Sequence, residues 1–438
     1  MNNTRLDSPR TIFAWSLYDW ANSAFATTIM AGFFPIFFSD YWSVGVDTTV
    51  STFRLGLANS IGSLLVAIMA PILGAIADQG TVKRKFLLFF AFIGILSTCA
   101  LYWVGQGYYL AAIAFYVFGS IGFAGGNVFY DSLIKGVASS KNMDKVSSYG
   151  FSLGYLGGGT LFAINVWMTL QPEVFGLADA AEAVKVSFLT VGVWWAVFSI
   201  PLFLFVKEPE MEKNKQQSIG AMIKAGINQV KTTFVEIRRI KMLVIFLLSY
   251  FCYMDGVDTI IRMSVDYGRS LNLATADLIT ALLVVQFVGF PAAIGFGFLG
   301  NRIGTKKAIL IAIFTYLIIT IFAALITNKT EFLMMACAVG LVQGGTQALS
   351  RSFYARMIPE GKSAQFFGFY NMIGKSAAIL GPILMGGVGI LVRSTGVSSE
   401  MASRISILSI LILFIIGGLL FLKVDEEKAK EQIKAVYG

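Results

Sequence analysis

The sequence contains no histidine among its 438 residues. Histidine is the commonest general base, a frequent metal ligand and the side chain that titrates nearest to neutral pH. The G-x-S-x-G match at Gly150–Gly154 therefore cannot belong to a Ser-His-Asp triad. The G-x-G-x-x-G match at Gly295–Gly300 ends an apolar run instead of following a strand, so we interpret both matches as helix-packing positions. The chain also lacks a G-x-x-x-x-G-K-[ST] motif, and we expect no enzyme, no metal site and no cofactor.

Charged residues are scarce. They make up 13% of the chain, whereas about a quarter of the residues of soluble domains are charged. Hydrophobic residues make up 56%, and the mean hydropathy is +0.73. This composition predicts a polytopic membrane protein. Cys99, Cys252 and Cys337 all lie in apolar runs, so we expect no disulfide framework. The first apolar run is too long for the apolar core of a cleaved signal peptide.

Apolar runs of membrane-spanning length recur along the whole chain. They cover residues 12–38, 53–77, 86–104, 109–134, 147–170, 185–206, 242–264, 276–299, 308–326, 332–357, 363–392 and 403–422. The predicted fold class is therefore an all-α integral membrane protein with twelve transmembrane helices.

Lysine and arginine are distributed unequally between alternate loops. One set of loops, together with both chain ends, contains the basic clusters at 83–85, 207–241 and 302–307. The opposite set contains only Arg54, Lys185, Arg262, Arg269, Lys329, Arg393 and Arg404. The positive-inside rule predicts that both termini are cytoplasmic, and we expect a bacterial inner (plasma) membrane. This distribution accounts for the net charge of +9 without a nucleic-acid partner.

The longest polar stretch separates six apolar runs from six. We expect an N-terminal half at 1–207, a cytoplasmic linker at 208–240, a C-terminal half at 241–423 and a cytoplasmic tail at 424–438. Apolar residues from Ile219 to Ile237 recur at helical spacing. This spacing predicts an amphipathic helix on the anionic inner leaflet, or alternatively a solvated linker helix.

The two halves repeat each other. Gly74-x-x-x-Asp78, followed by Lys83, corresponds to Gly297-x-x-x-Asn301, followed by Lys306. A tandem six-helix repeat predicts a substrate site between the halves, near the bilayer midplane.

A polar cluster lies inside the first apolar run, at Tyr18-Asp19-Trp20-Ala21-Asn22-Ser23. Asp19, Asn22 and Ser23 share one helix face because they stand at i, i+3 and i+4. An ionisable side chain at that depth costs about 2.5 to 3.5 kcal/mol on insertion scales. We therefore expect this face to look into a bundle interior or a watery cavity rather than at lipid.

Two repeat-equivalent helices carry polar stripes at intervals of four residues. The fourth span has Asn127, Asp131 and Lys135, and the tenth has Gln343, Gln347 and Arg351. Our hypothesis is that Asp131 and Arg351 pair across the halves when the cytoplasmic side closes. The alternative is that each is satisfied within its own half, Asp131 by Lys135 for instance.

The seventh and eleventh spans carry further charges. Asp255, Asp258 and Arg262 lie on the seventh, with Asp258 and Arg262 in the favourable i, i+4 order. Asn371 and Lys375 lie on the eleventh. Lys375 either pairs with an acid, with Asp255 and Asp19 as candidates, or binds an anionic group of the substrate; a purely structural ion pair is the alternative. Proton coupling would have to use Asp19, Asp131, Asp255 or Asp258, and Na⁺ coupling stays open.

The repeated glycine–acid–basic loops resemble the loop signature of the major facilitator superfamily. The resemblance implies that Asp78 and Arg302 belong to latches at the cytoplasmic helix ends, with a weaker second latch because Asn301 replaces an acid. More specifically, Tyr18–Phe25, Gln343–Arg351, Phe366–Tyr370 and Gly374-Lys375 resemble the bacterial relatives of the autophagy-linked vacuolar amino-acid effluxer. This resemblance implies a 6+6 pseudo-symmetric fold, alternating access, a small solute and, as the activity, amino-acid export.

The sequence thus predicts a secondary transporter for a small polar or zwitterionic solute, with amino-acid efflux as the leading activity and H⁺ or Na⁺ as the candidate coupling ions. The alternatives are an exporter or flippase of amphiphiles such as drugs and lysolipids, and a non-transporting receptor or scaffold. We expect a monomer with membrane lipids around it. The predicted substrate-binding or coupling residues are Tyr18, Asp19, Asn22, Asn127, Tyr130, Asp255, Asp258, Gln343, Gln347, Asn371 and Lys375; the predicted cytoplasmic gate is Asp131, Arg351, Asp78 and Arg302.

Overall fold

The computed structural model describes residues 6–46, 48–78, 82–208, 219–271, 273–377 and 380–437. Every regular element in these ranges is helical. Twelve stretches of the described residues are long and apolar enough to cross a membrane. The predicted all-α fold with twelve spans is confirmed.

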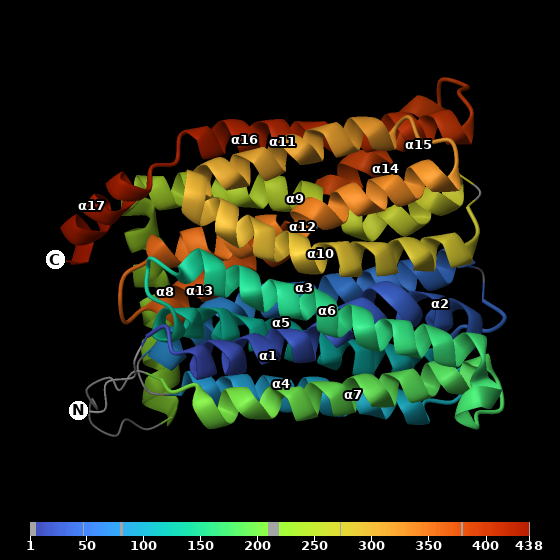
Figure 1. Cartoon of the computed structure of the whole chain (residues 1–438), viewed down its shortest axis with the longest axis horizontal. Helices are drawn as coiled ribbons and strands as arrows, with labels where there is room; N and C mark the ends of the chain where they lie inside the picture. The colour runs from blue at the N-terminus through green and yellow to red at the C-terminus, as the bar shows by residue number, and fades with distance from the viewer. Residues whose placement is uncertain are drawn as a thin grey trace. The chain divides into compact units, whose positions relative to one another are not determined.

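The first six spans are built from consecutive helices (Figure 1). They are α1 (Pro9–Ala24), η1 (Phe25–Phe33), α2 (Phe34–Phe37), η2 (Phe38–Trp42), α3 (Thr48–Asp78), α4 (Lys83–Ala100), η3 (Leu101–Trp103), α5 (Tyr109–Val137), α6 (Met143–Leu170), η4 (Pro172–Phe175) and α7 (Ala180–Phe205). The elements η1 and η2 are π-helical, so the first span is widened after its polar cluster.

The later elements begin with the linker helix. They are α8 (Ile219–Arg239), α9 (Lys241–Ser270), α10 (Thr275–Ile303), α11 (Thr305–Ala323), α12 (Lys329–Arg356), α13 (Ser363–Ser376), α14 (Leu380–Arg393), α15 (Ser399–Leu408), α16 (Leu411–Leu422) and α17 (Glu426–Tyr437). The eleventh span is interrupted between α13 and α14, and the twelfth between α15 and α16. The side chains of residues 219–227 lie outside the described part of α8, so the amphipathic character predicted for the linker stays a prediction.

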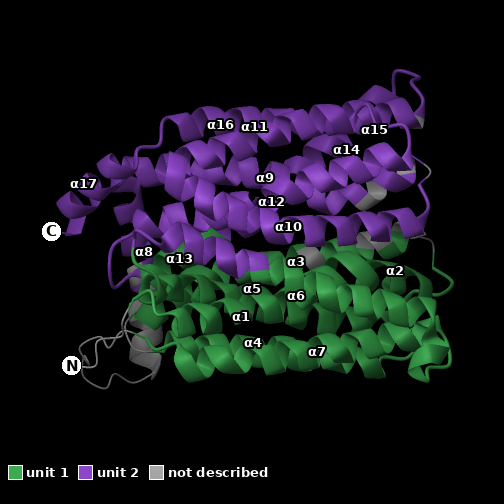
Figure 2. Ribbon diagram, viewed as in Figure 1, with its two compact units in different colours: residues 1–139, 153–226, 363–371 green, residues 140–152, 227–362, 372–438 purple. Residues whose placement is uncertain are grey.

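The chain folds into two compact units, drawn in green and purple in Figure 2. Unit 1 comprises residues 1–139, 153–226 and 363–371, and unit 2 comprises residues 140–152, 227–362 and 372–438. Three of the described helices are therefore shared between the units, because α8 is also divided, at residues 226 and 227. The first turns of α6 belong to unit 2 and the rest to unit 1, whereas the first turns of α13 belong to unit 1.

Small residues allow the helices of unit 1 to pack closely. A Cβ added to Gly154 would lie 2.6 Å from Ser23 Oγ, and one added to Gly158 would lie 2.8 Å from Thr27 Oγ1. Such close backbone approach is how helices associate in lipid, where packing replaces the hydrophobic driving force. The tight interface expected for this stretch of α6 is confirmed, and α1 is the partner.

Aromatic rings and a glycine also pack closely in the core of unit 2. Tyr316 stacks on Phe414 with the ring centroids 5.2 Å apart, and the backbone of Gly417 lies against Tyr253. Large apolar side chains on the outside of both units, such as Phe92 (58% exposed) and Leu419 (58% exposed), have no protein cover. Apolar side chains exposed on membrane spans are suited to contact lipid.

Candidate functional site

Unit 1 holds a buried polar cluster between α1 and α5. The Tyr130 hydroxyl donates a hydrogen bond to Asp19 Oδ2 at 2.7 Å. Asn22 Nδ2 donates to Asn127 Oδ1, also at 2.7 Å. Asp19 is 8% exposed and Asn22 is 2% exposed, so the polar face of the first span is buried inside the unit. The expectation that this face avoids lipid is confirmed.

Aromatic rings surround this cluster. Trp15 stacks on Tyr130 with the centroids 4.5 Å apart, and Trp15 Nε1 donates to the Tyr130 carbonyl at 3.2 Å. Tyr18 lies on the same ring at 5.0 Å, and Gly126 leaves the room that its hydroxyl occupies. The carboxylate of Asp19 is thus held in a rigid aromatic setting, as a ligand-binding acid requires.

A second polar contact of unit 1 joins α5 to α13. Asn371 Nδ2 donates to Asp131 Oδ2 at 3.3 Å and to the Phe367 carbonyl at 3.0 Å. Asp131 is 8% exposed, and Asn371 is half-buried. The structure therefore brings together two predicted residues that the sequence analysis had assigned to different roles, one to the gate and one to the substrate site.

One end of unit 1 carries the starts of α4 and α13 and the end of α3; we call it the basic end of that unit. There Asp78 pairs with Lys83 at 2.7 Å and accepts hydrogen bonds from the backbone N–H groups of Ala364 (3.1 Å) and Gln365 (2.7 Å). Lys83 Nζ donates to Ser363 Oγ at 2.8 Å. A carboxylate at a helix N-terminus is favoured by the unpaired N–H groups and the helix dipole.

Glycines bring α3 and α13 into backbone contact beside Asp78. A Cβ on Gly74 would lie 2.3 Å from the Ala364 carbonyl oxygen. A Cβ on Gly368 would lie 2.5 Å from the Ala70 carbonyl oxygen. Each helix therefore presents a glycine to the backbone of the other.

Arg351 is held within unit 2 by the first turns of α6. Its Nε donates to Ser147 Oγ and its Nη2 to the Ser147 carbonyl, both at 2.9 Å. Its guanidinium lies 4.3 Å from the centre of the Phe151 ring. Arg351 is only 2% exposed, so the predicted gate residue is a buried cation with several partners. The pairing of Asp131 with Arg351 stays a prediction.

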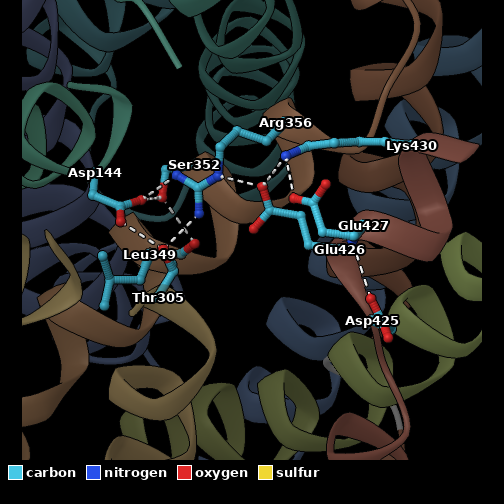
Figure 3. Close-up of polar contacts among 9 residues, drawn as sticks. All are labelled: Asp144, Thr305, Leu349, Ser352, Arg356, Asp425, Glu426, Glu427 and Lys430. Carbon is cyan, nitrogen blue, oxygen red and sulfur yellow. Dashed lines mark hydrogen bonds and ion pairs between the residues drawn. The ribbon is translucent and has the colours of Figure 1, made fainter. Parts of the chain in front are cut away.

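One end of unit 2 carries the starts of α6, α11 and α17 and the end of α12; we call it the basic end of unit 2. It contains a larger network, shown in Figure 3. Asp144, at the start of α6, accepts hydrogen bonds from Thr305 and Ser352 and pairs with Arg356 at 2.7 Å. Arg356 also pairs with Glu426 of the tail helix α17 at 3.1 Å. Four segments, the starts of α6, α11 and α17 and the end of α12, are thereby tied at one point.

Unit 2 also contains the acids of α9. Asp255 is fully buried (0% exposed), and its Oδ1 accepts a hydrogen bond from the Gly381 N–H at 2.9 Å. Asp258 interacts electrostatically with Arg262 and with Lys375. The structure thus adds Asp258 to the acids considered as partners of Lys375. Gln343 and Gln347 are half-buried on α12.

Sequence reasoning missed three members of the basic-end networks: Asp144, Ser147 and Arg356. The repeat held a signal for Asp144, because the start of α6 corresponds to the start of α13, which binds Asp78. In the second copy of the repeat, Asn301 stands at the position equivalent to Asp78. The acid of that copy is Asp144, which lies on α6, the helix equivalent to α13. Arg302, which we expected in the gate, is exposed at the end of α10.

The sequence matches the family described as "Vacuole effluxer Atg22 like" over residues 43–142 and 135–434. The chain belongs to this family. Two relatives illustrate its range. The MFS-type transporter YxiO of Bacillus subtilis (strain 168) is 36% identical over 428 residues, which cover 95% of either chain. Autophagy-related protein 22 of Eremothecium gossypii is 23% identical over 438 residues, which cover 86% of this chain and 85% of the relative.

Solved structures show the same fold. The human organic anion transporter MFSD10 (TETRAN) matches with a TM-score of 0.68 at 14% identity, over 94% of this chain and 100% of that chain. The proton:xylose symporter XylE matches with a TM-score of 0.66 at 15% identity, over 98% of each chain. Family and fold together make this Atg22-like protein a multi-pass secondary transporter of the major facilitator superfamily, as its sequence motifs predicted.

Proposed function

We propose that this Atg22-like protein exports amino acids across the inner membrane of a bacterial cell and couples export to protons. The observation that carries the proposal is the set of charges buried in its spans. Unit 2 offers an acid and a base together, because Asp258 interacts electrostatically with Lys375. A zwitterion needs one acid for its ammonium and one base for its carboxylate, and charged groups inside spans mark substrate or ion pathways.

The orientation proposed for the chain assigns the polar networks at the helix ends to one side of the membrane. With the lysine-rich loops in the cytoplasm, the basic ends of both units face the cell interior. Alternating access exposes the site to one side at a time, so the networks at Asp78 and Asp144 belong to the cytoplasmic closure in this proposal.

The test is counterflow in proteoliposomes with a mixed amino-acid panel, with and without a pH gradient. Wild type is expected to exchange amino acids, and Lys375→Ala is expected to raise KM about tenfold or more, since a charge-assisted hydrogen bond contributes about 1.5 to 3 kcal/mol. Lys307→Ala is the matched control, because Lys307 is exposed at the start of α11. Absence of amino-acid flux under every gradient would refute the proposal.

The same vesicles test the alternative substrate class. A lysolipid carries an anionic headgroup that Lys375 can also bind. Inhibition of counterflow by amino acids but not by lysolipid supports the amino-acid assignment. Transport of a labelled lysolipid with no amino-acid exchange would favour an exporter of amphiphiles.

A further inference from the structure

The acids of α9 contact both parts of the interrupted eleventh span. Asp258 interacts electrostatically with Lys375, near the end of α13. Asp255 Oδ1 accepts a hydrogen bond from the Gly381 N–H, in the first turn of α14, and a longer one of 3.4 Å from Thr259 Oγ1. The Leu380 N–H also stabilises the Asp255 carboxylate. Asp255 thus fixes the first described residues of α14 to another helix, α9.

The approach of α14 to α9 is as close as a backbone allows. A Cβ on Gly381 would lie 1.8 Å from Thr259 Oγ1 and 3.0 Å from Asp255 Oδ1. Glycine at this position is therefore what lets the Asp255 carboxylate reach the first turn of α14.

The second oxygen of the Asp255 carboxylate, Oδ2, takes no part in this contact. Asp255 is 0% exposed, and among the described residues its Oδ2 has no hydrogen-bond partner. Titratable side chains near it are Asp258 and Cys252 on its own helix, and Asp258 is offset by Arg262 and by Lys375 of α13. From α14 it faces backbone N–H groups, and α16 presents the uncharged Phe414 to the neighbouring Gly256. A buried carboxylate oxygen without a donor is a site where a proton is stabilised.

The interruption also lies near the point where the two units share a helix. Residues 363–371 of α13 belong to unit 1, and the chain from 372 onward belongs to unit 2. The chain therefore passes from one unit to the other inside α13, just before the segment held by α9. Hinges of this kind are a few residues near element ends.

We propose that Asp255 is the proton-binding residue of the transport cycle and that its charge decides whether the first turn of α14 is fixed to α9. The inference rests on the proposed proton-coupled export. A proton adds to Oδ2 and yields the neutral carboxylic acid, and no other bond is made or broken. The charge-assisted hydrogen bond to the Gly381 N–H then becomes an ordinary, weaker one, and the first turn of α14 is free to move with the hinge. Loss of the proton on the other side of the membrane restores the bond.

Hydrogen exchange on the full-length protein in lipid nanodiscs tests this without any substrate. After correction for intrinsic rates, protection of the first turn of α14 in wild type is expected to fall several-fold as pH is lowered from about 8 to about 5. In Asp255→Asn, position 255 carries no titratable group. Protection of the first turn of α14 in this variant is therefore expected to be low and independent of pH. Asp40→Asn, at an exposed aspartate, is the control and is expected to behave as wild type. Asp255→Ser serves if the asparagine variant does not fold.

Transport gives an independent readout. In Asp255→Asn the ratio of accumulation driven by a pH gradient to counterflow exchange is expected to fall more than tenfold. An unchanged ratio, or pH-dependent protection of α14 that survives in both neutral variants, would overturn the assignment of Asp255. If wild type moves no amino acid, the proposed function fails, while hydrogen exchange still decides whether Asp255 controls α14.

Discussion

Arg356 and Asp144 form an ion pair at 2.7 Å although 212 residues separate them in sequence. Their side chains are 9% and 4% exposed, so the pair is shielded from solvent. Removing one partner of a buried pair leaves the other charge uncompensated. The network around them is therefore expected to contribute measurably to stability.

Asp144→Ala is expected to destabilise the protein by about 1.5 to 3 kcal/mol, because Arg356 loses its charge-assisted bond to Asp144 but keeps Glu426 as a partner. Thermal unfolding in detergent measures the loss. The control is Lys428→Ala, whose ion pair with Asp425 is long (3.8 Å) and exposed, and there we expect at most a few tenths of a kcal/mol. Equal melting temperatures for both variants would contradict the structural importance of the pair.

Asp78→Asn is expected to shift the conformational balance rather than the fold alone. The amide still accepts a hydrogen bond from Gln365 N–H, but it cannot offset the Lys83 charge at 2.7 Å. A cysteine placed at Ser363 would report the change as faster labelling by a membrane-impermeant maleimide from the side of the basic end. The Asp40→Asn variant is again the control, and unchanged labelling of the Asp78 variant would count against a latch at this position.

Tyr130→Phe removes the hydroxyl that binds Asp19 at 2.7 Å. If Asp19 binds the solute, loss of its orienting hydrogen bond should raise the counterflow KM by about tenfold, as expected for a hydrogen bond to a charged group. Tyr108→Phe, at a residue that is 69% exposed, is the control. A large loss of thermal stability with an unchanged KM would instead make this contact purely structural.

Gly381→Ala places a methyl group where only 1.8 Å separates the new carbon from Thr259 Oγ1. Overpacking of this kind costs about 1 to 3 kcal/mol and should lower the melting temperature. Gly386→Ala, on the same helix with nothing within 4 Å of the added carbon, provides a matched control and should leave stability within about 0.5 kcal/mol.

The tail helix α17 should respond to acid. The backbone N–H of Lys428, together with that of Glu427, holds the pKa of the Asp425 carboxyl below its usual range. Because this folded-state pKa is depressed, the stabilisation is fully present above the ordinary value of about 3.9 and is lost as pH falls through the lower value. After correction for intrinsic rates, hydrogen exchange of α17 should therefore accelerate below about pH 4. In Asp425→Ala it should be fast at every pH, and an acid response that persists in that variant would implicate other groups.

The sequence predicts the membrane fold well because hydrophobic length and charge asymmetry are local properties. Asp19 and Asn22 could be assigned to a buried face from their helical spacing alone. The networks at the basic ends could not be predicted in the same way. Ser147 and Arg351 come together only because α6 starts in one unit and continues in the other, and no local pattern encodes that exchange. The hydrogen bond from the Gly381 N–H to Asp255 was equally hidden, since it depends on how α14 packs against α9.

The contact between α3 and α13 has a consequence for the energy of opening. Because Gly74 and Gly368 meet backbone rather than side chains, few interlocked side chains have to separate when the two helices part. In the hypothesis of a latch, the polar bonds of Asp78 to Lys83, Ala364 and Gln365 are among those that have to break. A helix contact made of backbone and a few polar bonds can open and close in every transport cycle without repacking of side chains in a core.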